Sequence, residues 1–137
     1  MKKINCILLV DDNPADNEIH KLKIIRANLC NHIKMVTSAP DALDYLTRSG
    51  NPDLSEQYPR PDIIFLDINM PGMNGFDFLE KYKELNEGLK SKIVIIMLSV
   101  SLDSENKKKV SESKEITEFM NKPLEIENLK MIIEKYL

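Results

Sequence analysis

The side chains best suited to chemistry in this sequence each follow a short apolar run. They are Asp11, Asp12, Asp67, Ser99 and Lys122. Carboxylates are hard oxygen ligands for a divalent cation, and a carboxylate is also a competent nucleophile toward phosphorus. A hydroxyl and an ammonium can stabilise the oxygens of a transferred phosphoryl group. If these five side chains meet at one place, they form a site suited to metal-assisted phosphoryl transfer.

The apolar runs before these side chains predict buried strands. Runs at 6–10, 63–66 and 93–98 lack polar alternation, which is typical of strands covered on both faces of a parallel sheet. Runs at 32–36 and 116–120 predict two shorter strands. Helical periodicity between and after the strands predicts four helices, and the alternation of elements leads us to expect a fifth, polar helix at 103–115. This alternation indicates an α/β fold with a doubly wound parallel sheet and right-handed crossovers.

The carboxyl ends of the strands share one edge of such a sheet, and ligands bind at that edge. Each candidate residue also has a simpler explanation when taken alone. Asp67 could cap a turn, and Asp11 and Asp12 could cap the following helix. Ser99 could be an ordinary turn residue and Lys122 a solvated loop lysine. Convergence at one edge favours a common site over these separate explanations.

The first predicted helix begins at Asn13-Pro14, an N-cap followed by proline at the first helical position. Asp16 lies in its first turn, where a negative charge is favourable. Apolar residues at helical spacing predict the face that packs on the sheet. They are Ala15, Ile19, Leu22, Ile25 and Leu29.

Three segments are candidates for partner contact. Residues 49–61 contain three prolines and no periodicity, which predicts a long loop, and long loops in compact domains are often functional. The helix expected at 103–115 is almost wholly polar apart from Val110, so we expect it to be weakly anchored and mobile. The last helix, with apolar residues at helical spacing from Ile126 to Tyr136, is a further candidate.

Length and charge exclude several classes of protein. The chain has 137 residues, 42% of them hydrophobic, which suits one globular domain. Its net charge of -3 comes from 19 basic and 22 acidic residues that are interspersed, so no direct nucleic-acid contact is expected. No apolar run approaches the roughly 20 residues of a membrane span. Asp11-Asp12 interrupts the apolar start, which argues against a signal peptide, so we expect a cytoplasmic location.

The remaining reactive side chains have ordinary explanations. Cys6 and Cys30 form no Cys-x-x-Cys motif, and we expect two free thiols. His20 and His32 are expected to be surface or helix-end residues. The lysines at 107–109 predict a solvated face rather than a binding site.

The strand-end motifs resemble, in combination, those of the receiver domains of two-component response regulators. The matching motifs are Val10-Asp11-Asp12, Asp67-Ile68-Asn69-Met70-Pro71 with Gly75, Ser99, and Lys122-Pro123. The resemblance spans nearly the whole chain. It implies a flavodoxin-like fold of five strands and five helices, with one receiver domain over residues 1–137 and no output domain. It is nearest to stand-alone regulators of the chemotaxis type, and the loop at 49–61 adds a likeness to regulators of bacterial phytochrome kinases.

The resemblance assigns a role to each matching residue. Asp67 would accept a phosphoryl group from a sensor histidine kinase or a histidine phosphotransfer protein. Lys122 and Ser99 would each contact a phosphoryl oxygen. Pro123 would follow a cis peptide bond.

The family also binds Mg²⁺, which keeps several waters and takes one or two carboxylates. By resemblance, Asp12, Asp67 and the backbone carbonyl of Asn69 would hold the ion directly, and Asp11 would hold it through water. Asn69 and Ser101 flank this place and would tune hydrolysis of the phosphoryl group.

The resemblance implies a switch with slow self-dephosphorylation rather than an enzyme. Ser99 would move toward the phosphoryl group, and Phe119 would rotate into the vacated space and signal to a downstream protein. Phe119 lacks the hydroxyl of a tyrosine, so its ring cannot switch between two positions that are each held by a hydroxyl hydrogen bond. The alternative is that Phe119 is an ordinary core residue. A homodimer also stays open.

Two other classes of function remain as alternatives. A phosphate-ester hydrolase of the haloacid dehalogenase type would also use a strand-end aspartate and Mg²⁺. That class needs a second aspartate two residues later, where this chain has Asn69. A binding module that works without phosphorylation could keep the pocket as a scaffold.

Overall fold

The computed structural model describes residues 3–85, 94–100 and 103–137, and its core is one parallel sheet. The sheet has five strands in the order β2-β1-β3-β4-β5. They are β1 (Ile4–Val10), β2 (Cys30–Val36), β3 (Ile63–Asp67), β4 (Val94–Ser99) and β5 (Glu118–Asn121). The predicted α/β fold with a parallel sheet is confirmed, with β2 beginning two residues before the predicted run and β5 beginning two residues after it.

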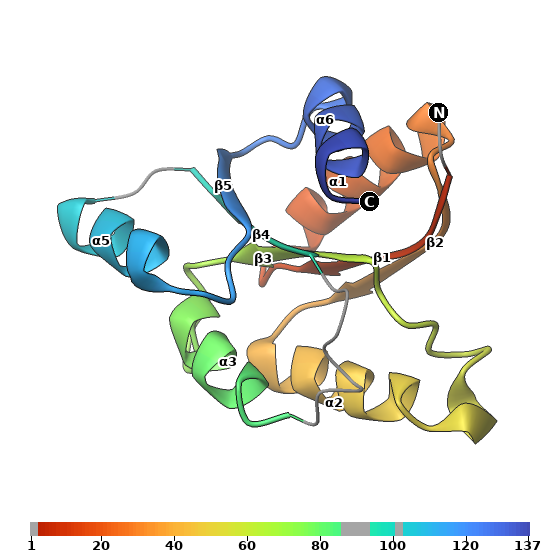
Figure 1. Cartoon of the computed structure of the whole chain (residues 1–137), viewed down its shortest axis with the longest axis horizontal. Helices are drawn as coiled ribbons and strands as arrows, with labels where there is room; N and C mark the ends of the chain where they lie inside the picture. Colours follow the sequence, from red (N-terminus) through yellow and green to blue (C-terminus); the bar gives the residue numbers. More distant parts are fainter. Residues whose placement is uncertain (1–2, 86–93, 101–102) are drawn as a thin grey trace.

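Helices cover both faces of the sheet (Figure 1). The described α-helices are α1 (Pro14–Ala27), α2 (Ala39–Ser49), α3 (Gly75–Tyr82), α5 (Ser104–Glu112) and α6 (Ile126–Tyr136), and a 3₁₀ helix, η1, spans Pro52–Leu54. Figure 1 shows α1 and α6 on one face of the sheet and α2 and α3 on the other. The layered arrangement leaves the carboxyl ends of the strands at one open edge.

Two apolar clusters form the core, one on each side of the sheet. Leu9 and Phe65 pack with Ile133 on the side of α1 and α6. Leu8 and Ile64 face the opposite side and pack with Phe78 of α3. Side chains alternate between the faces of a strand, so strands buried on both sides need the unbroken apolar runs that the sequence shows.

The predicted inner face of α1 is wrong except for Leu29, which follows the helix and is buried in the core. Ile19, Leu22 and Ile25 are 49%, 50% and 51% exposed. The buried residues of this helix are instead Asn17, His20 and Ile24. The spacing of apolar residues predicted the wrong face because α1 carries apolar residues on two faces, and the more apolar of the two is exposed to solvent. Its inner face is partly polar because the beginning of α1 lies beside the carboxyl edge of the sheet.

The expected surface position of His20 is therefore wrong as well. It is 3% exposed rather than a surface residue, and burial lowers the pKa of its imidazole. His32 in β2 is exposed, as predicted. Cys6 is buried and Cys30 half-buried, and both are free thiols.

Helix α5 is anchored as weakly as its polar sequence predicts. None of its residues is buried. Val110 is half-buried and packs on the apolar cluster between the sheet and helices α2 and α3, which contains Leu8, Ile64 and Phe78. The Lys109 ammonium lies 5.4 Å from the centre of the Phe76 ring. These contacts are few, so small changes in free energy can move this helix.

The segment at 49–61 packs against α2 rather than extending freely. The Tyr45 hydroxyl donates to the Pro59 carbonyl at 2.6 Å. The Tyr58 ring meets the Tyr45 ring edge to face, and the Arg48 guanidinium lies over Tyr58. The segment leads into the beginning of β3, so it lies at the opposite edge of the sheet from the strand ends. Its contribution to partner binding stays a prediction.

Candidate functional site

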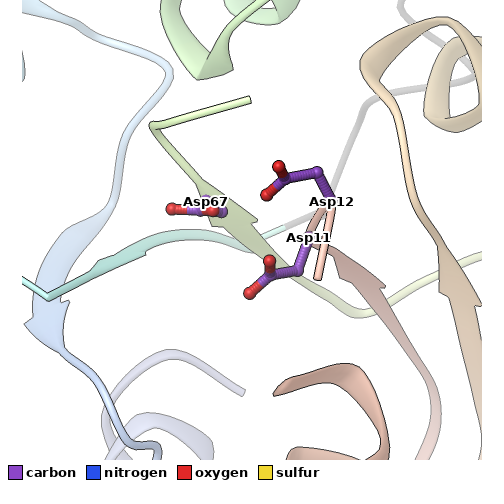
Figure 2. Close-up of side chains that lie close together, drawn as sticks. All are labelled: Asp11, Asp12 and Asp67. Atoms are coloured by element: carbon purple, nitrogen blue, oxygen red, sulfur yellow. The ribbon is translucent and has the colours of Figure 1, made fainter. Parts of the chain in front are cut away.

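Three carboxylates meet at the carboxyl edge of the sheet. Asp11 and Asp12 follow β1, and Asp67 ends β3 (Figure 2). One oxygen from each lies within 4.8 Å of the others. Asp11 and Asp67 are buried and Asp12 is exposed, so the cluster opens to solvent on the side of Asp12. The predicted convergence of these three residues is confirmed.

Hydrogen bonds from the start of α1 fix Asp11. The Asn13 backbone N–H donates to Asp11 Oδ1 at 3.0 Å. The Asn17 side-chain amide donates to the Asp11 carbonyl and to the Val36 carbonyl, both at 3.2 Å. Asn13 also caps α1 by accepting from the N–H groups of Ala15 and Asp16. The turn that begins the helix therefore also orients the carboxylate.

Asp67 is held by the chain that turns away from β3. The Asn69 N–H donates to Asp67 Oδ1 at 3.3 Å. Helix α3 begins directly against this turn, where the Gly75 N–H donates to the Ile68 carbonyl at 2.9 Å. A Cβ atom at position 75 would lie 2.8 Å from the Asp67 carbonyl oxygen. Only glycine fits here without moving the backbone of Asp67.

Lys122 brings a positive charge into the cluster from the end of β5. Its ammonium nitrogen lies 2.6 Å from Asp11 Oδ2 and 3.5 Å from Asp67 Oδ2. The Lys122 N–H donates to the Ser99 carbonyl at 2.7 Å, and the Lys122–Pro123 peptide bond is cis. Burial alone would lower the pKa of Lys122, but hydrogen bonds to Asp11 and Asp16 and the nearby negative charges raise it.

The other predicted residues lie around this cluster. Ser99 is 1% exposed and ends β4, where it pairs in register with Asn121 beside Lys122. Asn69 is exposed beside Asp67. Phe119 is half-buried and packs on the cluster of α2 and α3. Ser101 lies outside the described residues.

Sequence reasoning missed three polar residues of α1 that reach this site. Asp16 Oδ2 lies 3.1 Å from the Lys122 ammonium. Asn17 and His20 line a cavity of about 10 Å³ that also borders Asp67. Among the described residues, Asn17 Oδ1 is buried without a hydrogen-bond partner, and the cavity has room for about one water. The signal in the sequence was the helical spacing of Asn17 and His20 with the apolar Ile24, which places all three on one face of α1.

Burial disfavours the charged form of Asp67. Burial raises the pKa of Asp67 from 3.8 to about 6; Lys122 opposes this rise and Asp11 adds to it. The folded protein therefore holds a proton on Asp67 between about pH 4 and pH 6 that the unfolded chain releases. As pH rises through this range, ionised Asp67 lowers the stability of the fold, by at most about 3 kcal/mol at neutral pH.

The three carboxylates fit a divalent cation with hard oxygen ligands, such as Mg²⁺. Such an ion prefers a few carboxylates and several waters, and the exposed side of Asp12 leaves room for water. Two buried carboxylates that share one lysine leave excess negative charge. The donor chemistry and the charge therefore both fit Mg²⁺.

Comparisons with known proteins agree with this geometry. The sequence model of the response regulator receiver domain matches residues 7–134. Two-component response regulator 24 of Arabidopsis thaliana is 30% identical over 128 residues, covering 93% of this chain and 81% of that protein.

Solved structures show the same architecture. A two-component response regulator from Cytophaga hutchinsonii has a TM-score of 0.84 at 30% identity, with 98% of both chains covered. A bacteriophytochrome response regulator has a TM-score of 0.71 at 29% identity, covering 98% of this chain and 77% of that one. Among the described residues, none of the helices has the length and apolar character that a membrane span requires.

Removing one charge from the cluster should stabilise the metal-free protein. We expect Asp67→Asn to raise the melting temperature at pH 7.5 by several degrees, because the unfavourable ionisation of Asp67 disappears. Asp12→Asn should raise it less, since Asp12 is exposed. Thermal unfolding with a chelator present measures both. The difference in melting temperature between Asp67→Asn and the wild-type protein should become smaller as the pH is lowered to 4. Unchanged or lower melting in both variants would contradict a crowded acidic site.

Cation binding should weaken below about pH 6. A proton on Asp67 competes with the metal for the same oxygens, so the affinity for Mg²⁺ should be nearly constant from pH 8 to 7 and about tenfold lower at pH 5. Isothermal titration calorimetry across this range measures the effect. Equal affinity at pH 7.5 and pH 5 would contradict metal binding through an Asp67 carboxylate whose pKa is raised.

Proposed function

The chain belongs to the response regulator receiver domain family, and we propose that it accepts a phosphoryl group on Asp67. The observation that supports this choice is the position of its carboxylate at the end of β3, 3.5 Å from the Lys122 ammonium and within reach of Asp11 and Asp12. The Asp67 side chain is 7% exposed and lies beside exposed Asp12, so a donor would approach it from that side. Phosphoryl transfer requires positioning and charge neutralisation, and this arrangement supplies both.

In the proposed transfer, an Asp67 oxygen forms a bond to phosphorus while the bond from phosphorus to the donor breaks. The donor is a phosphohistidine of a histidine kinase or phosphotransfer protein, or a small acyl phosphate. Lys122 and the Ser99 hydroxyl stabilise the phosphoryl oxygens. A Mg²⁺ ion bound by Asp12, Asp67 and the Asn69 carbonyl, with Asp11 bonded through water, would supply the remaining positive charge.

We propose that the resulting acyl phosphate is lost slowly and that it acts as a signal. Hydrolysis needs a base to activate water, and Asn69 offers an amide where a hydrolase of the haloacid dehalogenase type has an aspartate. Phe119 and α5 lie on the same side of the sheet, and α5 has no buried residue. A shift of Ser99 toward the phosphoryl group would favour a different position of Phe119 and α5, which a downstream protein reads.

We also propose that the protein donor docks on the outer face of α1. This face begins beside the site, because Asp16 in the first turn contacts Lys122. It carries an exposed apolar row, Ile19, Leu22 and Ile25, which has no role in the core. A donor must bring its phosphohistidine to Asp67, so an apolar face that starts at the site is well placed to hold it.

Acetyl phosphate tests the acceptor directly. With Mg²⁺, we expect intact mass to show one added phosphoryl group that decays slowly, and Asp67→Asn to show none, because an amide oxygen is too weak a nucleophile. Turnover of a small phosphate ester would favour the hydrolase. No modification of the wild-type protein would favour a binding module that works without phosphorylation.

Leu22→Ser tests the docking face. We expect this variant to accept the phosphoryl group from its histidine donor protein at least threefold more slowly, but from acetyl phosphate at the wild-type rate. The matched control is Met131→Ser on α6, where Met131 is 41% exposed. Equal slowing by both variants, or slowing with acetyl phosphate, would contradict docking on α1.

A further inference from the structure

Lys122 is shared by three carboxylates, one of which comes from outside the metal-binding group. Its ammonium lies 2.6 Å from Asp11, 3.1 Å from Asp16 and 3.5 Å from Asp67. An ammonium has three N–H donors, and three carboxylates already surround this one. A phosphoryl oxygen must therefore compete with these carboxylates for Lys122.

Asp16 is the contact that costs least to release. Its side chain is 33% exposed, whereas those of Asp11 and Asp67 are 6% and 7% exposed. Water can solvate the Asp16 carboxylate when the lysine leaves, but it reaches the two buried carboxylates poorly. Asp16 also lies on α1, so it can lose its partner without disturbing the ends of β1 and β3.

We infer that Asp16 is a positioning residue that holds the Lys122 ammonium partly away from Asp11 and Asp67 in the resting protein. This inference rests on the proposed function and deepens it. The contact has two consequences of opposite sign. It reduces the competition between Lys122 and Mg²⁺ for the same carboxylates, which favours metal binding. It also competes with the phosphoryl group for Lys122 and adds a negative charge nearby, both of which disfavour the phosphorylated state.

The Asp16→Asn variant tests whether Asp16 acts on metal and phosphoryl binding or only stabilises the fold. Without the Asp16 charge, Lys122 bonds more fully to Asp11 and Asp67. We expect Mg²⁺ to bind about threefold to fivefold more weakly by isothermal titration calorimetry, the size expected for one partly exposed ion pair. Beryllofluoride, a phosphoryl analogue, should bind about threefold to fivefold more tightly at saturating Mg²⁺, as measured by ¹⁹F NMR.

Control variants isolate the contact. Asp16→Glu keeps the charge, so the dissociation constants for Mg²⁺ and for beryllofluoride should both return toward the wild-type values. Glu18→Gln removes the same charge from an exposed position of α1 and should leave both constants within about twofold. Asp16→Ala serves as a second variant should Asp16→Asn fold poorly, and it should shift both constants in the same directions as Asp16→Asn.

The outcomes distinguish this inference from the proposed function. Opposite shifts of the two constants support the role of Asp16. No shift, or weakening of both ligands together, overturns it while leaving phosphorylation of Asp67 intact. Failure of beryllofluoride to bind the wild-type protein with Mg²⁺ would overturn the proposed function and this inference with it.

Discussion

The structure depends on holding like charges close together at the edge of a parallel sheet. Asp11, Asp12 and Asp67 place oxygens within 4.8 Å of one another, and two of the three residues are buried. At such spacing, each repulsion costs on the order of 4 kcal/mol at an effective dielectric near 20. The Lys122 ammonium opposes this repulsion, and burial adds the largest cost to the ionisation of Asp67. A cation bound here would relieve the repulsion that the fold maintains and would offset the negative charge that a phosphoryl group adds.

The apolar core supplies the free energy that holds these charges in place. Strands β1 and β3 are neighbours, with Leu9 paired to Phe65 and Val10 paired to Leu66 in register. Both strands pack on both faces, so the carboxylates that follow them cannot separate without breaking the sheet. Gly75 adds a second constraint, because the close approach of α3 fixes the turn after Asp67. The site is thus strained locally and supported by packing elsewhere.

The sequence was enough to predict the sheet and the residues at its carboxyl edge, because buried parallel strands have continuous apolar runs and end at polar residues. It failed for α1, where Ile19, Leu22 and Ile25 form the more apolar face but lie outside. Periodicity identifies the apolar faces of a helix but does not show which face packs on the sheet. In α1 the inner face carries Asn17 and His20, which lie beside the carboxylate cluster. The contact of Asp16 with Lys122 joins residues 106 positions apart. No local pattern encodes such a contact, so only the folded structure shows it.

The most direct test is a crystal structure of the protein with Mg²⁺ and beryllofluoride. We expect beryllium bonded to an Asp67 oxygen, with Lys122 and Ser99 in contact with its fluorines. The cation should lie about 2.1 Å from oxygens of Asp12, Asp67 and the Asn69 carbonyl, as octahedral Mg²⁺ requires. Beryllofluoride bound elsewhere, or a cation that does not touch Asp67, would show that this cluster is not the phosphoryl-acceptor site.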